Sequence, residues 1–231
     1  MTFLSPTASR YVKAATPARR IVLMMALLLA LPFAFSVQPA RAAAPAETFI
    51  DTNVQKGLAI LANQTISDTQ RKAQFRTFLL GLTDLNRIAL FTLGPAKRTA
   101  SDADKAAFVD AFRDFAISIY ETRLTSYSGQ TLKITGSQPT QKGDTIVNTT
   151  LVDPHASNNQ PLPVAFRVSN TDGKMVVIDV NVLGVWLAIE ERDQFSSFLG
   201  DHGNSVPALV AHLKDLTQQM RNGAPLPSPQ Q

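Results

Sequence analysis

Histidine is the side chain in this sequence best suited to hold a metal ion or to transfer protons near neutral pH. There are three, His155, His202 and His212, and the chain has no cysteine. None of the histidines has a second histidine or a carboxylate at the spacing of a known metal motif. We therefore expect surface histidines, no metal site and no cofactor.

Paired carboxylates are the next candidates, because two of them can serve as general acid and general base. Glu190 and Glu191 are adjacent, and neighbouring residues of a helix point in different directions, so a solvated helix face is expected. Asp179 interrupts an apolar strand, out of phase with its apolar neighbours, and a water-exposed sheet face would account for it. Serine-hydrolase, zinc-protease and phosphate-loop motifs are absent. The sequence predicts no catalytic residue and a protein that is not an enzyme.

The most strongly patterned stretch is a predicted hairpin from Leu162 to Gly184, followed by a helix from Val185 to Leu199. Apolar residues alternate with polar or small ones in both strands, and Asp172-Gly173 suits the turn. A sheet face leading into an amphipathic helix predicts a wall and a lid around an apolar space. The residues that carry this pattern are Val164, Phe166, Val168, Val176, Ile178, Val180, Val182, Trp186, Ile189, Phe195 and Phe198.

The remaining elements are expected to be helices at both ends of the chain and further strands between them. Ser67 with Gln70 forms a predicted capping box, and Ser101 begins a helix with a single stripe of Phe108, Phe112, Phe115 and Ile119. Two more strands are predicted, at 131–136 and 145–152. The fold class is therefore α+β: a curved antiparallel sheet of about four strands, packed by N-terminal and C-terminal helices around an apolar pocket.

Residues 1–42 have the order of a secretory signal peptide: basic residues, an apolar run over 21–31, and Ala40-Arg41-Ala42 for cleavage. An uncleaved membrane anchor is the alternative. Five of the 22 basic residues but no acidic residue lie in this leader, so the mature chain carries a formal charge of −1. Nucleic-acid binding is therefore not expected. We predict a periplasmic protein with a single α+β domain over 43–222 and a flexible tail over 223–231.

Three blocks of sequence resemble, in order and spacing, the MlaC or toluene-tolerance family of periplasmic phospholipid-transport proteins. The likeness covers about residues 47–217. The first block runs from Arg87-Ile88-Ala89 through Leu93-Gly94 to Arg98-Thr99-Ala100-Ser101. The second runs from Ala111-Phe112-Arg113 through Tyr120 to Tyr127-Ser128-Gly129-Gln130. The third joins Ile178-Asp179-Val180, Gly184-Val185 and Arg192-Asp193-Gln194-Phe195.

The resemblance implies a curved sheet embraced by helices, with acyl chains between them and the head group near the surface. It implies a shuttle between an inner-membrane ABC lipid-transport complex and an outer-membrane lipoprotein complex, which maintains outer-membrane lipid asymmetry; we expect a monomer. Lys97 and Arg98 are the predicted head-group contacts. The predicted lipid-binding residues are Phe91, Phe112, Phe115, Ile119, Tyr120, Val164, Phe166, Ile178, Val180, Val182, Val185, Trp186, Ile189 and Phe195.

Three alternatives stay open. A subgroup of the same family accompanies hopanoid synthesis, which implies a polycyclic lipid as ligand. A small isomerase could use a carboxylate and a tyrosine, for which Asp179, Tyr120 and Tyr127 are the candidates. A structural adaptor between membrane complexes would use the exposed faces of the last two helices.

Overall fold

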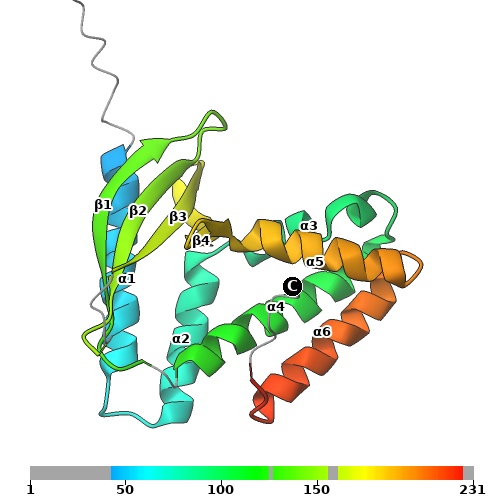
Figure 1. The fold of residues 1–231 in the computed structure, drawn as a ribbon, viewed down its shortest axis with the longest axis horizontal. Coiled ribbons are helices and arrows are strands. Elements are labelled where there is room, and N and C mark those ends of the chain that lie inside the picture. The colour runs from blue at the N-terminus through cyan, green and yellow to red at the C-terminus, as the bar shows by residue number, and fades with distance from the viewer. Residues whose placement is uncertain (1–42, 125–126, 156–160, 226–231) are drawn as a thin grey trace, which may run out of the picture. The chain divides into compact units, whose positions relative to one another are not determined.

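The computed structural model describes residues 43–124, 127–155 and 161–225 (Figure 1). The predicted signal peptide and residues 226–231 of the predicted tail lie outside these ranges. No helix in the described ranges is long and apolar enough to cross a bilayer. The helices are α1 (Ala43–Ala62), α2 (Asp68–Leu82), α3 (Leu85–Thr92), the 3-10 helix η1 (Gly94–Arg98), α4 (Asp102–Leu124), α5 (Leu187–Asp201) and α6 (Val206–Arg221).

The strands form one antiparallel sheet in the order in which they occur along the chain. The four predicted strands are present, and a two-residue strand after the hairpin is added at the edge of the sheet. The predicted α+β class and antiparallel sheet are confirmed. The strands are β1 (Thr131–Pro139), β2 (Thr145–Val152), β3 (Leu162–Thr171), β4 (Lys174–Val182) and β5 (Val185–Trp186).

Several helices begin where the sequence places a capping residue. The Ser67 hydroxyl accepts a hydrogen bond from the Gln70 backbone N–H, and the Gln70 side chain accepts one from the Ser67 N–H, so the capping box is confirmed. Ser101 Oγ accepts from the Asp104 N–H at 3.1 Å, at the start of α4. These local bonds satisfy helix N–H groups that have no partner within the helix.

A β-bulge in β4 changes which residues face which side of the sheet. Arg167 pairs with Asp179, whereas the next residue of β3, Val168, pairs with Val177, so Ile178 is left without a partner. The sequence predicted that Val176, Ile178, Val180 and Val182 share one face of the strand. This prediction is wrong for Val176 and Ile178. Val177 takes their place on the apolar face, because the extra residue reverses the alternation.

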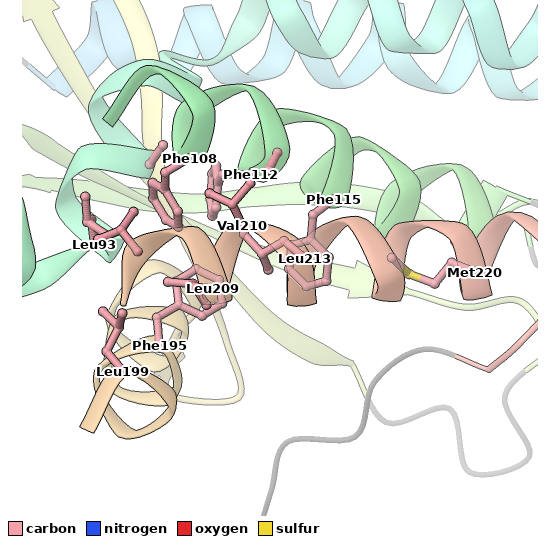
Figure 2. Close-up of a cluster of buried hydrophobic side chains, with 13 residues drawn as sticks. Leu93, Phe108, Phe112, Phe115, Phe195, Leu199, Leu209, Val210, Leu213 and Met220 are labelled. Atoms are coloured by element: carbon pink, nitrogen blue, oxygen red, sulfur yellow. The ribbon is translucent and has the colours of Figure 1, made fainter. Parts of the chain in front are cut away.

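Two separate groups of apolar side chains stabilise the fold. The first lies between α1 and the sheet, where Ala46 and Ile50 pack with Val147, Val168 and Val177. The second joins α3, α4, α5 and α6, and Figure 2 shows its side chains. We call these the sheet core and the helical core. The largest members of the helical core are Leu93, Phe108, Phe112, Phe115, Phe195, Leu199, Leu209, Leu213 and Met220.

Polar contacts connect the sheet to the helices around it. The Asp84 backbone N–H, at the junction of α2 and α3, donates to the Val177 carbonyl at 3.4 Å. Arg87 of α3 donates to Ser169 Oγ of β3 at 2.9 Å, and the Ala188 N–H of α5 donates to Asp179 Oδ1 at 3.0 Å. These bonds fix the start of α3 and the start of α5 to the sheet.

Candidate functional site

The sheet face that packs on α1 is sealed at one end and partly open at the other. At the sealed end, Val168 and its β4 partner Val177 are each 2% exposed, and Val147 of β2, the partner of Phe166, is 0% exposed. Towards the other end, Val164 and Phe166 of β3 are only half-buried. Their partners on β4, Val182 and Val180, are also half-buried. Paired residues point to the same side of a sheet, so these four side chains form one apolar surface, which we call the candidate face.

Neighbouring elements contribute further half-buried apolar residues beside the sheet core. Val54 of α1, Leu82 of α2 and Ile134 of β1 pack against the sheet core, and all three are half-buried. The domain therefore carries apolar surface on this side of the sheet that its own side chains leave partly exposed. Burying such surface contributes roughly 25 cal/mol per Å², so an apolar guest placed there would be stabilised.

The predicted phenylalanines of α4 and α5 do not reach the candidate face. The ring of Phe195 lies 6.3 Å from that of Phe112 and 6.4 Å from that of Phe115, measured between centroids, and all three are at most 5% exposed. Ile119 packs against the same helical core. These side chains fill one another's space, which requires no ligand. The spacing of these residues along the sequence cannot show whether they fill a core or line a binding site.

Four more of the predicted lipid-binding residues lie at the surface or on the other side of the sheet. Phe91, Val185 and Ile189 are 42%, 47% and 36% exposed, and the Arg192 guanidinium stands 5.2 Å from the Phe91 ring. Trp186 pairs with Asn181, which places it opposite the candidate face, with the Arg167 guanidinium 5.9 Å from its ring. Of the other two, Ile178 occupies the bulge and Tyr120 is half-buried on α4.

The predicted head-group residues, Lys97 and Arg98, are exposed on η1. This short helix packs against α5: a Cβ on Gly94 would come within 3.2 Å of Ser196 Oγ and 3.4 Å of Arg192 Cγ. The structure therefore places the two cations beside the helical core and does not bring them together with the candidate face.

The predicted lid is not where the sequence placed it. The start of α5 is bonded through Ala188 to Asp179, which points away from the candidate face because it pairs with Arg167. Phe195 and Leu199 then direct the helix into the helical core. The β3–β4 hairpin is the predicted wall, but α1 and α2, rather than α5, supply the side chains that pack against it.

Two buried carboxylates and partly exposed arginines form a charged cluster on the opposite face of the sheet. Asp144 is 6% exposed, and its carboxylate lies 3.4 Å from Arg167 Nε and 4.0 Å from Arg87 Nη2. Asp179 is 7% exposed, so the prediction of a water-exposed position is wrong. Burial raises the pKa of Asp179, although hydrogen bonds from the Ala188 and Val180 N–H groups and the charge of Arg167 act in the other direction. Because Oδ1 accepts both N–H bonds, this carboxylate serves as an anchor for α5.

Glu191 also departs from the predicted solvated face. It lies three residues after Ala188 and four before Phe195, which are both buried, so all three share one side of α5. Burial, assisted by the charge of Glu190, raises the pKa of Glu191 to about 7. In the described ranges, the structure places no group that could act as a catalytic partner beside Asp179 or Glu191.

The three histidines lie in different surroundings. No group of three histidine, cysteine, aspartate or glutamate residues that could hold an ion occurs among the described residues. His155 is exposed, and His202 stacks on Phe198 with 3.9 Å between ring centroids. His212 was predicted to lie at the surface but is half-buried. Its ring also stacks on Phe198, with 4.6 Å between ring centroids, and burial lowers its pKa.

Two surface hollows of about 490 Å³ each lie elsewhere. One is lined by both helices of the α2–α3 junction, Arg113 and the β3–β4 turn; the other lies between α1 and α2 around Ile60 and Phe78. Neither includes a residue of the candidate face. Both are open to solvent, and polar side chains line part of each.

Comparisons with known proteins bear on the family and the fold. The family model described as MlaC protein matches residues 51–215 of this chain. A solved structure of a phospholipid-binding protein from Ralstonia solanacearum, in complex with a phospholipid, is similar with a TM-score of 0.67 and 22% sequence identity. The match covers 76% of this chain and 98% of that chain. At this identity the likeness shows a shared fold.

Proposed function

Because this chain belongs to the MlaC family, we propose that it binds a phospholipid and carries it between the inner and outer membranes of a Gram-negative cell. In this proposal the protein is the periplasmic component of an ABC lipid-transport system. It would exchange lipid with an inner-membrane complex and with an outer-membrane lipoprotein complex, acting as a monomer. The signal-peptide pattern of residues 1–42 supports export.

The half-covered candidate face is the observation that carries the proposal. Acyl chains need no directional bonds, only apolar surface from which water is excluded, and each buried methylene contributes roughly 0.8 kcal/mol. Val164, Phe166, Val180 and Val182 offer such a surface on neighbouring strands. The phospholipid bound by the Ralstonia protein, which shares this fold, supports the same class of ligand here.

A binding role is also favoured over an enzymatic one. The isomerase alternative needs a carboxylate and a tyrosine that share a cavity. Asp179 instead points away from the candidate face and accepts two backbone hydrogen bonds. We therefore propose a carrier that changes no covalent bond.

Lipid extraction tests the proposal. Protein purified without added lipid is extracted with organic solvent, and the extract is analysed by mass spectrometry. We expect about one phospholipid per protein; a hopanoid in its place would reassign the ligand class, and an extract without lipid would contradict the proposal. Phe166→Asp should abolish retention, because it places a charge in the candidate face. Val152→Asp is the matched control, since Val152 pairs with Thr131 on the other face of the sheet and is already 44% exposed.

A further inference from the structure

The turn between β4 and β5 has an unusual sequence for its backbone conformation. Val182 pairs with Val185, so the hairpin loop has only two residues, Leu183 and Gly184. Both have positive φ, 53° and 91°. Such turns favour Asn-Gly or Gly-Gly, because a branched or bulky side chain is strained in the left-handed region. A leucine at this position therefore stabilises neither the turn nor the strand pair.

The same leucine gains nothing from burial. Leu183 is 65% exposed, the largest value among the exposed large apolar residues of the described chain, and Val185 is 47% exposed. Ile189, in the first turn of α5, is 36% exposed. No charged side chain occurs from Val180 to Ile189. Leu183 and Val185 thus form an uncharged apolar projection on a strained backbone, and the stability of the fold does not account for it. Exposed apolar residues and strained backbone of this kind are typical of contact sites.

The projection is continuous with the candidate face. Val185 is the cross-strand partner of Val182, so its side chain lies on the same side of the sheet. Val182 in turn pairs with Val164. Apolar side chains therefore follow one another on this side of the sheet from the half-buried candidate face to the exposed turn, which we call the apolar tip (Leu183, Gly184 and Val185).

We infer that the apolar tip contacts the surface of a phospholipid bilayer and places Leu183 and Val185 at the boundary of head groups and acyl chains. The role of this contact in lipid transfer rests on the proposed function, since the tip would join the candidate face to the hydrocarbon of the membrane. The contact is apolar, so its strength should depend little on anionic lipid or on salt. A bilayer is a better fit than an acidic or basic protein surface, because the tip has no charge to complement either.

Flotation with lipid vesicles tests the inference. Purified protein is mixed with phosphatidylcholine vesicles, with or without phosphatidylglycerol, at low and at high salt. We expect similar flotation under all four conditions. Leu183→Asp should reduce vesicle binding by about tenfold or more, because an aspartate cannot enter the acyl region. Leu80→Asp, which changes an exposed leucine of α2, should bind as the unaltered protein does.

A second variant protects the test against misfolding. Leu183→Asn gives the turn the Asn-Gly sequence that its backbone favours, so the variant should fold at least as well and still lose vesicle binding. Flotation equal to that of the unaltered protein in both tip variants overturns the inference, as does failure of the unaltered protein to float; the tip would then face a protein partner. The lipid content of each protein, measured by mass spectrometry, tests the proposed function separately, because retention depends on the candidate face and flotation on the tip.

Discussion

Neutralising Glu191 should change how the stability of the protein depends on pH. This carboxyl lies on the same side of α5 as Ala188 and Phe195, which are 6% and 5% exposed. Burial and the neighbouring Glu190 raise its pKa from the ordinary 4.5 to about 7. The folded protein therefore holds a proton that the unfolded chain releases over this range. Glutamine has almost the same shape and no charge, so Glu191→Gln removes the titration and preserves the packing.

The sign of the effect follows from proton linkage. A raised pKa means that the folded state is favoured while the group is protonated in both states, which holds below pH 4.5. This contribution falls as the pH rises and is lost above about pH 7. The interval corresponds to about 3 kcal/mol, at about 1.4 kcal/mol for each pH unit. Above pH 7, Glu191→Gln should therefore be more stable than the unaltered protein by up to about 3 kcal/mol, and below pH 4.5 the two should be equal.

Thermal unfolding followed by circular dichroism between pH 4 and 8 measures this difference. For a domain of this size, about 3 kcal/mol raises the melting temperature by about 6 to 12 °C. Asp193→Asn is the control, because it removes a carboxylate of the same helix whose side chain is 63% exposed. If the melting temperatures of Glu191→Gln and the unaltered protein differ by the same amount at every pH, the carboxyl is not desolvated in the folded state and the reasoning fails.

Three further predictions concern the anchor of α5, the helical core and a helix cap. The raised pKa of Asp179 should make the free energy of unfolding decline as the pH rises above about 4, and Asp179→Asn should remove this decline. Urea unfolding across the acid range measures it; the same dependence on pH in the variant and the unaltered protein would contradict a buried charge. Phe195→Ala should lower the free energy of unfolding by about 3 to 5 kcal/mol, because its ring packs edge-on against Phe108 and Phe112; a loss below about 1 kcal/mol would mean that the core is not filled as described. Ser67→Ala should cost about 1 kcal/mol in thermal unfolding, whereas Ser67→Gly should cost only a few tenths, and equal losses would argue against the cap.

Local chemistry made much of the architecture predictable. Ser67, Ser101 and Ser205 accept hydrogen bonds from backbone N–H groups three residues away, so the start of each helix depends on its immediate neighbours. Alternating apolar residues likewise predicted the β3–β4 hairpin, since strand periodicity is a local property. The order of three motif blocks indicated the family, and the family match confirms it.

The candidate site was only partly predictable, because its residues were chosen by type and spacing. Val164, Phe166, Val180 and Val182 were correctly expected to share one face of the hairpin. Phe112 and Phe195 have the same apolar character, yet they pack against each other in the helical core. Whether an apolar stripe meets another stripe or an unfilled space depends on the packing of distant elements, which periodicity does not contain.

The sequence by itself determined the caps, the helices, the hairpin and the family of this protein, because each depends on residues close together in the chain or on their order along it. The tertiary structure alone decided which face each β4 residue occupies, since the bulge at Ile178 arises from pairing with β3. It also decided that Asp179 is buried and that Glu191 is partly shielded from water, although aspartate and glutamate are usually surface residues. Desolvation depends on everything that surrounds a group in the folded protein, and the surroundings of Asp179 include Arg167 of β3 and the start of α5, which belong to other elements.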